Sequence, residues 1–134
     1  MLQLMNIVHL IRVLKNIKRN TMHKTNILEN LTYGEEKVVI TPLLETDVSK
    51  EIRIVFKKEQ IMKEHKTSFP ITVEIFEGAI DFGVDGTTYK LVKGDIVTLD
   101  SNVKHDLKAN DDSIVRLTLS KKDTINRVKG VLQL

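Results

Sequence analysis

Cysteine and tryptophan are absent from this chain of 134 residues, and aromatic residues make up only 4% of it. The lack of cysteine excludes disulfide bonds, thiol nucleophiles and thiolate metal sites, and it agrees with a location in the cytoplasm. With so few aromatic residues, a core must be built from Ile, Val and Leu, whose β-branched members favour strands. The sequence also lacks a glycine-rich phosphate loop, a His-Glu-x-x-His pair and a nucleophile elbow, which excludes the enzyme classes that depend on these motifs.

A strong excess of charge of one sign is missing from most of the chain as well. The formal net charge is +3, yet residues 1–21 hold four basic residues and no acidic one, which leaves 17 basic against 18 acidic residues in 22–134. The basic residues of this body are scattered, whereas nucleic-acid binding needs a clustered basic face. We therefore expect no nucleic-acid partner. The length predicts one domain, residues 22–134, preceded by an extension, residues 1–21.

The extension is rich in apolar residues over 2–17, with a polar residue at every third position. Polar residues at this spacing wind around a helix of 3.6 residues per turn and do not gather on one face. The segment is therefore predicted to be a short helix without a continuous apolar face. The run is too short and too often interrupted to span a membrane, and its charge order is the reverse of a secretory signal. Three interpretations stay open: a start assigned too far upstream, with Met22 the true first residue; a helix packed on the body or a partner; or a helix on an anionic membrane surface.

The body shows the two-residue periodicity of half-buried strands almost throughout. Turn residues separate these short runs, and Asp85-Gly86 between two alternating segments is a strong hairpin signal. Short strands at this spacing, with no helical block between them, indicate a β-sandwich or barrel. The predicted strands are 37–40, 48–57, 71–76, 79–84, 87–92, 95–99 and 113–120, and the tail from 121 to 134 is left open between helix and strand.

Two histidines, His65 and His105, flank the hairpin region at a distance that only a folded-back sheet can close. Convergent histidines in an apolar barrel are a common way to hold a metal or a small ligand. If Ile71 faces inward, alternation turns Val73 inward too and Glu74 outward. The expected pocket residues are therefore His65, Thr67, Ile71, Val73 and His105, in a mainly apolar interior.

The stretch around His105 resembles the second motif of the cupins, which reads Gly, five residues, Pro-x-Gly, two residues, His, three residues, Asn. In this register the glycine and the histidine match, whereas three positions depart: the chain has Gly94, Asp100, Asn102, His105 and Ala109 in this order. The resemblance covers roughly residues 37–120 and implies an all-β, cupin-like double-stranded β-helix, a jelly-roll barrel.

The first cupin motif, Gly, five residues, His-x-His, three or four residues, Glu, six residues, Gly, is weaker in this chain. We align the motif on Gly78 and place three residues before its Glu position. Its Gly, His, His, Glu and Gly positions then hold Glu59, His65, Thr67, Ile71 and Gly78. One of its three metal ligands remains, together with the ligand of the second motif. The resemblance therefore implies at most an incomplete site for Fe, Mn, Ni or Zn on His65 and His105, whereas catalytic metal sites usually have three protein ligands.

Three functions fit these residues. The first is a barrel that binds a small molecule in a mainly apolar pocket beside the two histidines. The second is a metal-dependent dioxygenase or isomerase that uses a divalent ion held by both histidines. The third is a free-standing sensor that works through protein contacts. We also expect a homodimer, because such barrels often pair through sheet edges and the nearly neutral body does not keep copies apart.

Overall fold

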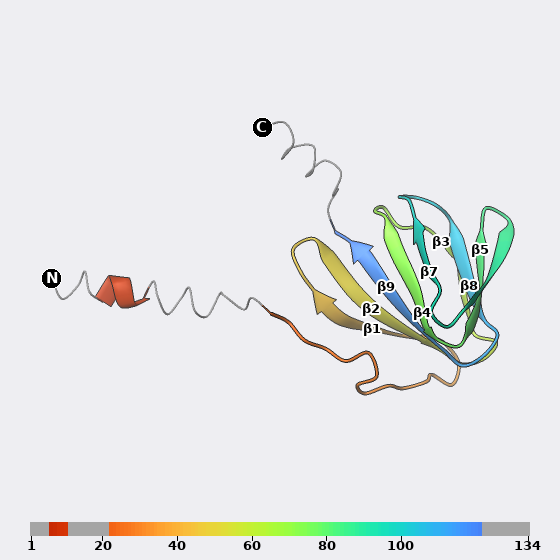
Figure 1. Ribbon diagram of the computed structural model, residues 1–134, viewed down its shortest axis with the longest axis horizontal. Coiled ribbons are helices and arrows are strands. Elements are labelled where there is room, and N and C mark those ends of the chain that lie inside the picture. The colour runs from red at the N-terminus through yellow and green to blue at the C-terminus, as the bar shows by residue number, and fades with distance from the viewer. Residues whose placement is uncertain (1–5, 11–21, 122–134) are drawn as a thin grey trace.

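The computed structural model describes residues 6–10 and 22–121. Within these ranges the chain forms nine strands, arranged in two antiparallel sheets (Figure 1). The larger sheet has the order β1-β2-β9-β4-β7 and the smaller one the order β3-β8-β5-β6. The strands are β1 (Val39–Glu45), β2 (Ser49–Phe56), β3 (Ile61–His65), β4 (Ile71–Glu77), β5 (Ala79–Val84), β6 (Thr87–Val92), β7 (Ile96–Leu99), β8 (His105–Ala109) and β9 (Ser113–Ser120).

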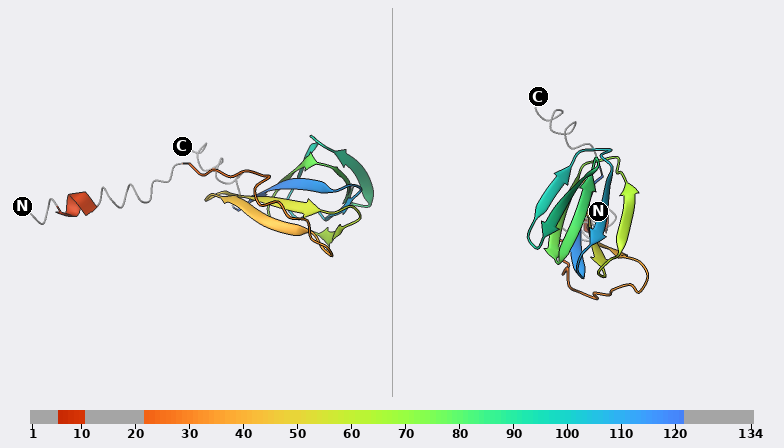
Figure 2. Two further views of the ribbon diagram at one scale, coloured as in Figure 1. Left: turned by 90° about the horizontal axis from the view of Figure 1, so that it is seen from below. Right: turned by 90° about the vertical axis from the view of Figure 1, so that its right-hand side faces the viewer.

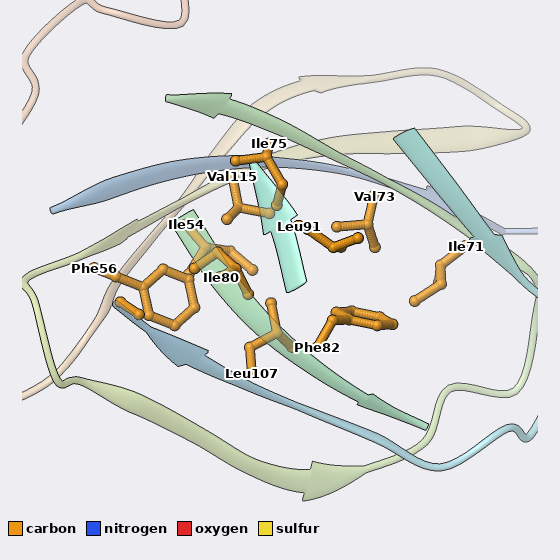
Figure 3. Packing of buried hydrophobic residues seen from close by; sticks show 11 residues of the cluster. Ile54, Phe56, Ile71, Val73, Ile75, Ile80, Phe82, Leu91, Leu107 and Val115 are labelled. Atoms are coloured by element: carbon orange, nitrogen blue, oxygen red, sulfur yellow. The ribbon is translucent and has the colours of Figure 1, made fainter. Parts of the chain in front are cut away.

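The two sheets lie face to face and enclose the core between them (Figure 2). Alternate residues of each strand point inward, as Ile71, Val73 and Ile75 do on β4. Phe82 on β5 and Phe56 on β2 are the largest apolar side chains of this core (Figure 3). The core is otherwise aliphatic, as the composition predicted.

The hairpin between β5 and β6 turns at Asp85 and Gly86, whose φ angles are 50° and 78°. Positive φ at both central residues is the type I′ turn, whose twist matches that of the flanking strands. Gly78, between β4 and β5, has φ 94°, and a Cβ there would collide with the backbone and hydroxyl of Ser113. The hairpin prediction is confirmed at both of its turn residues.

A segment before β1 is fastened to the outer face of the larger sheet. Arg53 of β2 is only 2% exposed and donates to the carbonyl oxygens of Ile27 and Glu29 at 2.7 and 2.8 Å, with a longer contact to that of Asn30. We call residues 26–30 the strap. Its own turn is closed by Asn26, whose side-chain oxygen accepts from the amide of Leu28.

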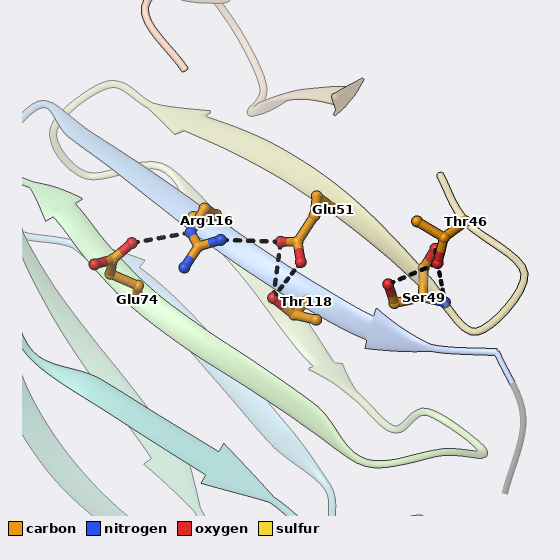
Figure 4. A network of polar contacts seen from close by, with 6 residues as sticks. All are labelled: Thr46, Ser49, Glu51, Glu74, Arg116 and Thr118. Atoms are coloured by element: carbon orange, nitrogen blue, oxygen red, sulfur yellow. Dashed lines mark hydrogen bonds and ion pairs between the residues drawn. The ribbon is translucent and has the colours of Figure 1, made fainter. Parts of the chain in front are cut away.

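Beside the strap, the same outer face carries a polar network (Figure 4). Arg116 of β9 donates to Glu74 of β4 and to Glu51 of β2, and Glu51 also accepts from the hydroxyl of Thr118. The outward direction predicted for Glu74 is therefore confirmed, which removes its carboxylate from the interior.

The predicted all-β class with a short N-terminal helix is confirmed. Residues 6–10 are helical, and the remainder of the predicted helical segment and the tail 122–134 lie outside the described residues. All seven predicted strands are present, with β1 extended through Pro42, which an edge strand with a bulge tolerates. Two further strands, β3 and β8, were not predicted. No helix of the described residues is long and apolar enough to cross a membrane.

Candidate functional site

The two histidines meet on neighbouring strands of the smaller sheet. His65 ends β3 and His105 begins β8, and the two residues are direct cross-strand partners. Their ring centroids are 4.3 Å apart and the ring planes are tilted by 60°. The fold thus closes the long sequence separation by pairing β3 with β8, and the two rings are close enough to contact one bound group together.

Both rings are held by the backbone in the same way. The Nδ1 atom of His65 lies 2.7 Å from the carbonyl oxygen of Lys63, and that of His105 lies 2.9 Å from the carbonyl oxygen of Val103. A carbonyl oxygen only accepts hydrogen bonds, so Nδ1 carries the proton in each ring. In the neutral form this leaves a lone pair on both Nε2 atoms.

His105 is the more enclosed of the pair. It is 3% exposed, and its ring stacks on Phe82 with centroids 5.8 Å apart and planes 18° apart. Burial lowers the pKa of His105, and the neighbouring His65 lowers it further, whereas the Val103 carbonyl and the charge of Asp106 oppose this shift. His105 is therefore disposed to be neutral at physiological pH.

The other three expected pocket residues have different surroundings. Thr67 uses its hydroxyl to donate to the Phe69 carbonyl at 2.9 Å, and its own carbonyl accepts from the amide of Asn102 at 2.8 Å. Thr67 therefore ties together the loops that follow β3 and β7. Ile71 and Val73 are each 3% exposed and belong to the packed core (Figure 3).

A cavity of about 260 Å³ lies between β5, β6 and β7. Its walls are mainly apolar, and Thr98 is a further contact. The other residues that line it are Phe82, Val84, Tyr89, Leu91, Val97 and Leu99. None of the five expected pocket residues lines it, but Phe82 does, and the ring of Phe82 stacks on that of His105. Val84, another wall residue, is the direct cross-strand partner of His105. The cavity and the histidine pair are thus adjacent.

Sequence reasoning did not find these cavity residues. Alternation along 79–84 and 87–92 does predict which side chains face inward, so Phe82 and Leu91 were recognisable as interior positions. The gap itself arises because β6 and β7 are edge strands of different sheets and do not pair with each other. No pattern within either strand carries that information.

The residues present do not fit a metal centre with three protein ligands. Within 6–10 and 22–121, no group of three or more His, Asp or Glu side chains is placed to hold a metal ion. The position that the cupin motif gives to a ligand Glu is Ile71, which has no donor atom, and Glu74 faces outward. Only the two Nε2 atoms could serve, and two imidazoles alone bind divalent metals weakly and with little selectivity.

Comparison with known proteins identifies the fold. No family model and no curated protein matches the sequence. An RmlC-like cupin protein from Desulfovibrio desulfuricans is similar in structure, with TM-score 0.69 and 22% identity over 74% of this chain and 96% of that one. A cupin superfamily protein from Desulfitobacterium hafniense gives TM-score 0.66 and 13% identity over 75% and 100% of the two chains.

A third similar structure is described as an uncharacterised conserved protein with a double-stranded β-helix domain, from Klebsiella pneumoniae. Its TM-score is 0.66, with 15% identity over 74% of this chain and 89% of that one. All three are less than 25% identical, so they establish the fold alone. The chain has the fold of a small cupin domain, as the motif resemblance predicted.

Two residues with positive φ stand at positions where the motifs have glycine. Glu59 stands at the leading glycine of the first motif and has φ 78°, and Asn102 stands at the Pro-x-Gly glycine of the second and has φ 64°. Both residues occupy the left-handed region, which glycine enters at no steric cost. Left-handed backbone therefore occurs at two positions where the cupin motifs have glycine.

Proposed function

We propose that the protein binds a small, mainly apolar molecule in the cavity between β5, β6 and β7, with the histidine pair beside it as the polar end of the site. The observation that carries this proposal is the apolar space of about 260 Å³ whose Phe82 wall is stacked on a buried imidazole. Pockets for small molecules are commonly apolar, with a few polar groups that orient the ligand.

The cavity opens to solvent beside Tyr89, which is 53% exposed, so its size limits only the part of an occupant that lies inside. An apolar cavity of roughly 150 Å³ accommodates benzene, and pockets for drug-sized ligands begin near ~300 Å³. A space of about 260 Å³ therefore suits a molecule with one ring or a short branched chain.

Cavity filling tests the proposal. Val97 lines the cavity, and its neighbour Ile96 points outward and is 60% exposed. We expect toluene, followed by NMR titration, to shift the methyl resonances of Leu91 and Val84 in the unaltered protein and in Ile96→Phe. In Val97→Phe the added ring occupies the space, so these shifts should disappear. Equal toluene binding in both variants, or none in the unaltered protein, would exclude the cavity as the site.

A metal-dependent enzyme is the second candidate, because the rings of His65 and His105 lie 4.3 Å apart and each directs its Nδ1 atom to a backbone carbonyl oxygen. The missing third ligand argues against it. A divalent ion would supply Lewis-acid chemistry there, and only His65 and His105 would hold it.

A further inference from the structure

We propose that the C-terminal tail, residues 122–134, packs against an uncovered apolar surface on the core-facing side of the larger sheet. We call this surface the overhang, and its residues are Ile40, Pro42, Ile52, Leu117 and Leu119. It lies on β1, β2 and β9, whereas the proposed ligand cavity lies at β7, on the other side of β4. The inference is therefore independent of the proposed function.

The overhang belongs to the face of the sheet that normally is buried. Direct cross-strand partners point to the same side of a sheet. Ile40 pairs with the core residue Ile54, and Pro42 pairs with Ile52, which packs against the core. Ile40 and Pro42 therefore point to the core side of the sheet, yet Ile40 is 54% exposed and Pro42 is exposed as well.

The exposure along β1 is the reverse of what a two-layered fold normally shows. Val39 and Thr41 point to the outer face and are half-buried, whereas Ile40 and Pro42, which alternate with them, are exposed. The hairpin of β1 and β2 reaches past the strands of the smaller sheet (Figures 1 and 2). The smaller sheet therefore leaves this end of the larger sheet without a covering layer.

The uncovered surface extends to the middle of the sheet. Ile52 pairs with Leu117, and both are only half-buried, as is Leu119 two residues further along β9. β9 is the central strand of five, and Val115, nearer to its start, is fully buried. An apolar surface that is continuous over three strands is typical of a contact site.

The described chain ends beside this surface. The amide of Lys121 donates to the carbonyl oxygen of Val48, and its ammonium group donates to Glu45 at 2.8 Å and to the carbonyl oxygen of Thr46 at 2.9 Å. These contacts fix the start of the tail at the tip of the β1–β2 hairpin. Residues 1–21, by contrast, precede the strap, which lies on the outer face.

The tail has the length and the composition to cover the overhang. Residues 122–134 would span about 20 Å as a helix and about 40 Å as an extended chain. The distance from β9 to β1 is two strand spacings, about 10 Å. Apolar residues recur along the tail at steps that place several of them on one side of a helix, and they are Ile125, Val128, Val131, Leu132 and Leu134.

A spin label in the tail of the full-length protein tests this contact. The chain has no cysteine, so Asn126→Cys provides a single attachment site, on the side of such a helix opposite to Val128. We expect the label to broaden the methyl resonances of Ile40 and Ile52. The methyl resonances of Ile96, which is 60% exposed on the outward side of β7, should keep their intensity. Ile40 and Ile52 resonances that are no broader than those of Ile96 would overturn the inference.

A mixed sample distinguishes the tail of the same chain from that of a second copy. Isotope-labelled protein without the spin label is combined with unlabelled protein that carries it. We expect the resonances of Ile40 and Ile52 to keep their intensity in this mixture. Broadening there would assign the overhang to a second copy and overturn the inference.

A matched pair of tail substitutions measures the contribution of the contact to stability. Val128→Asp places a charge among the apolar residues of the tail, and Asn126→Asp places the same charge on the opposite side. Both changes lie outside the β-sandwich, so its own packing is unaltered. We expect a lower melting temperature in Val128→Asp than in Asn126→Asp. Equal melting temperatures would overturn the inference.

Discussion

His105 concentrates most of the unusual chemistry of this molecule in one side chain. It is an ionisable group with 3% exposure, one ring nitrogen bonded to the backbone and another imidazole 4.3 Å away. Protonation would place a charge in an apolar environment next to a second histidine. At the residue scale, therefore, the fold favours the neutral ring, which is the form that offers an acceptor.

The lowered pKa of His105 makes stability depend on pH. Above about 6.5, the ordinary histidine pKa, the ring is neutral in both the folded and the unfolded chain, and it has no effect. Below that value the unfolded chain takes up the proton first, so stability falls with falling pH until the folded ring is protonated as well. We expect the melting temperature to drop between pH 7.5 and pH 5.5, measured by circular dichroism.

The drop should be smaller in His105→Phe and unaltered in His23→Gln, since His23 is exposed. An equal drop in all three proteins would assign the effect to other groups.

Glu59 permits a second test at this scale. A residue other than glycine costs about 1–2 kcal/mol in the left-handed region, and glycine costs about 0.5–1 kcal/mol through the entropy of the unfolded chain. Its ion pair with Lys108, at 3.5 Å, is exposed and adds little. Urea unfolding should therefore show Glu59→Gly to be more stable by about 0.5–1 kcal/mol. Glu59→Ala, which loses the same carboxylate but keeps a Cβ, should show no gain.

Among the elements, the strands that bear the histidines are those that the sequence did not reveal. β3 is an edge strand with exposed Ile61, Lys63 and Glu64, and β8 has only Leu107 and Ala109 as apolar interior residues. β3 is a short edge strand, and β8 lies inside the smaller sheet but has only two apolar residues, so neither gives a clear periodic signal and both are set by tertiary pairing. The longer strands were predictable because their inward faces are almost entirely aliphatic.

The strap illustrates the same limit. Nothing in the sequence indicates that Arg53, in the middle of a predicted strand, would be buried under residues 26–30. A charged residue at an outward position is normally solvated, and here the carbonyl oxygens of a turn replace the water. The contact depends on the path of a loop, which local periodicity does not encode.

Arg53 and Arg116 are direct cross-strand partners, so the same substitution can be compared at both. Arg53→Met removes hydrogen bonds from a buried cation to the strap and should cost about 2–3 kcal/mol in urea unfolding. Arg116 is 41% exposed, and its ion pairs with Glu74 and Glu51 are worth less, so Arg116→Met should cost under ~1 kcal/mol. Equal costs would show that the strap adds no stability through Arg53.

For the molecule as a whole, the double-stranded β-helix explains how a chain with little local signal for a site can still build one. Pairing within the smaller sheet brings β3 and β8 together, and the packing of the two sheets leaves a space where β6 and β7 do not pair. The motif resemblance predicted the fold, and it did not predict the cavity. That space depends on side chains from three strands whose mutual placement is tertiary.

Metal binding is also a property of the whole molecule, because the two histidines that could hold an ion come from separate strands. With no third ligand, we expect purified protein to hold less than one divalent ion per chain, and a mild chelator to remove it without changing the melting temperature. Elemental analysis and thermal melting before and after chelation measure both quantities. Tight stoichiometric metal that is lost in His105→Ala would instead favour the metal-dependent enzyme.

The account depends above all on two neighbouring imidazoles that each direct a proton on Nδ1 to the backbone, one of which stacks on a wall of the cavity. Long-range ¹H–¹⁵N NMR of the histidine rings at pH 8 observes this directly. We predict the Nδ1–H form for both His65 and His105, and a shift of the His105 ring resonances when toluene fills the cavity that Phe82 lines. Nε2–H rings, or His105 resonances that do not respond to toluene while cavity methyl groups do, would contradict the account.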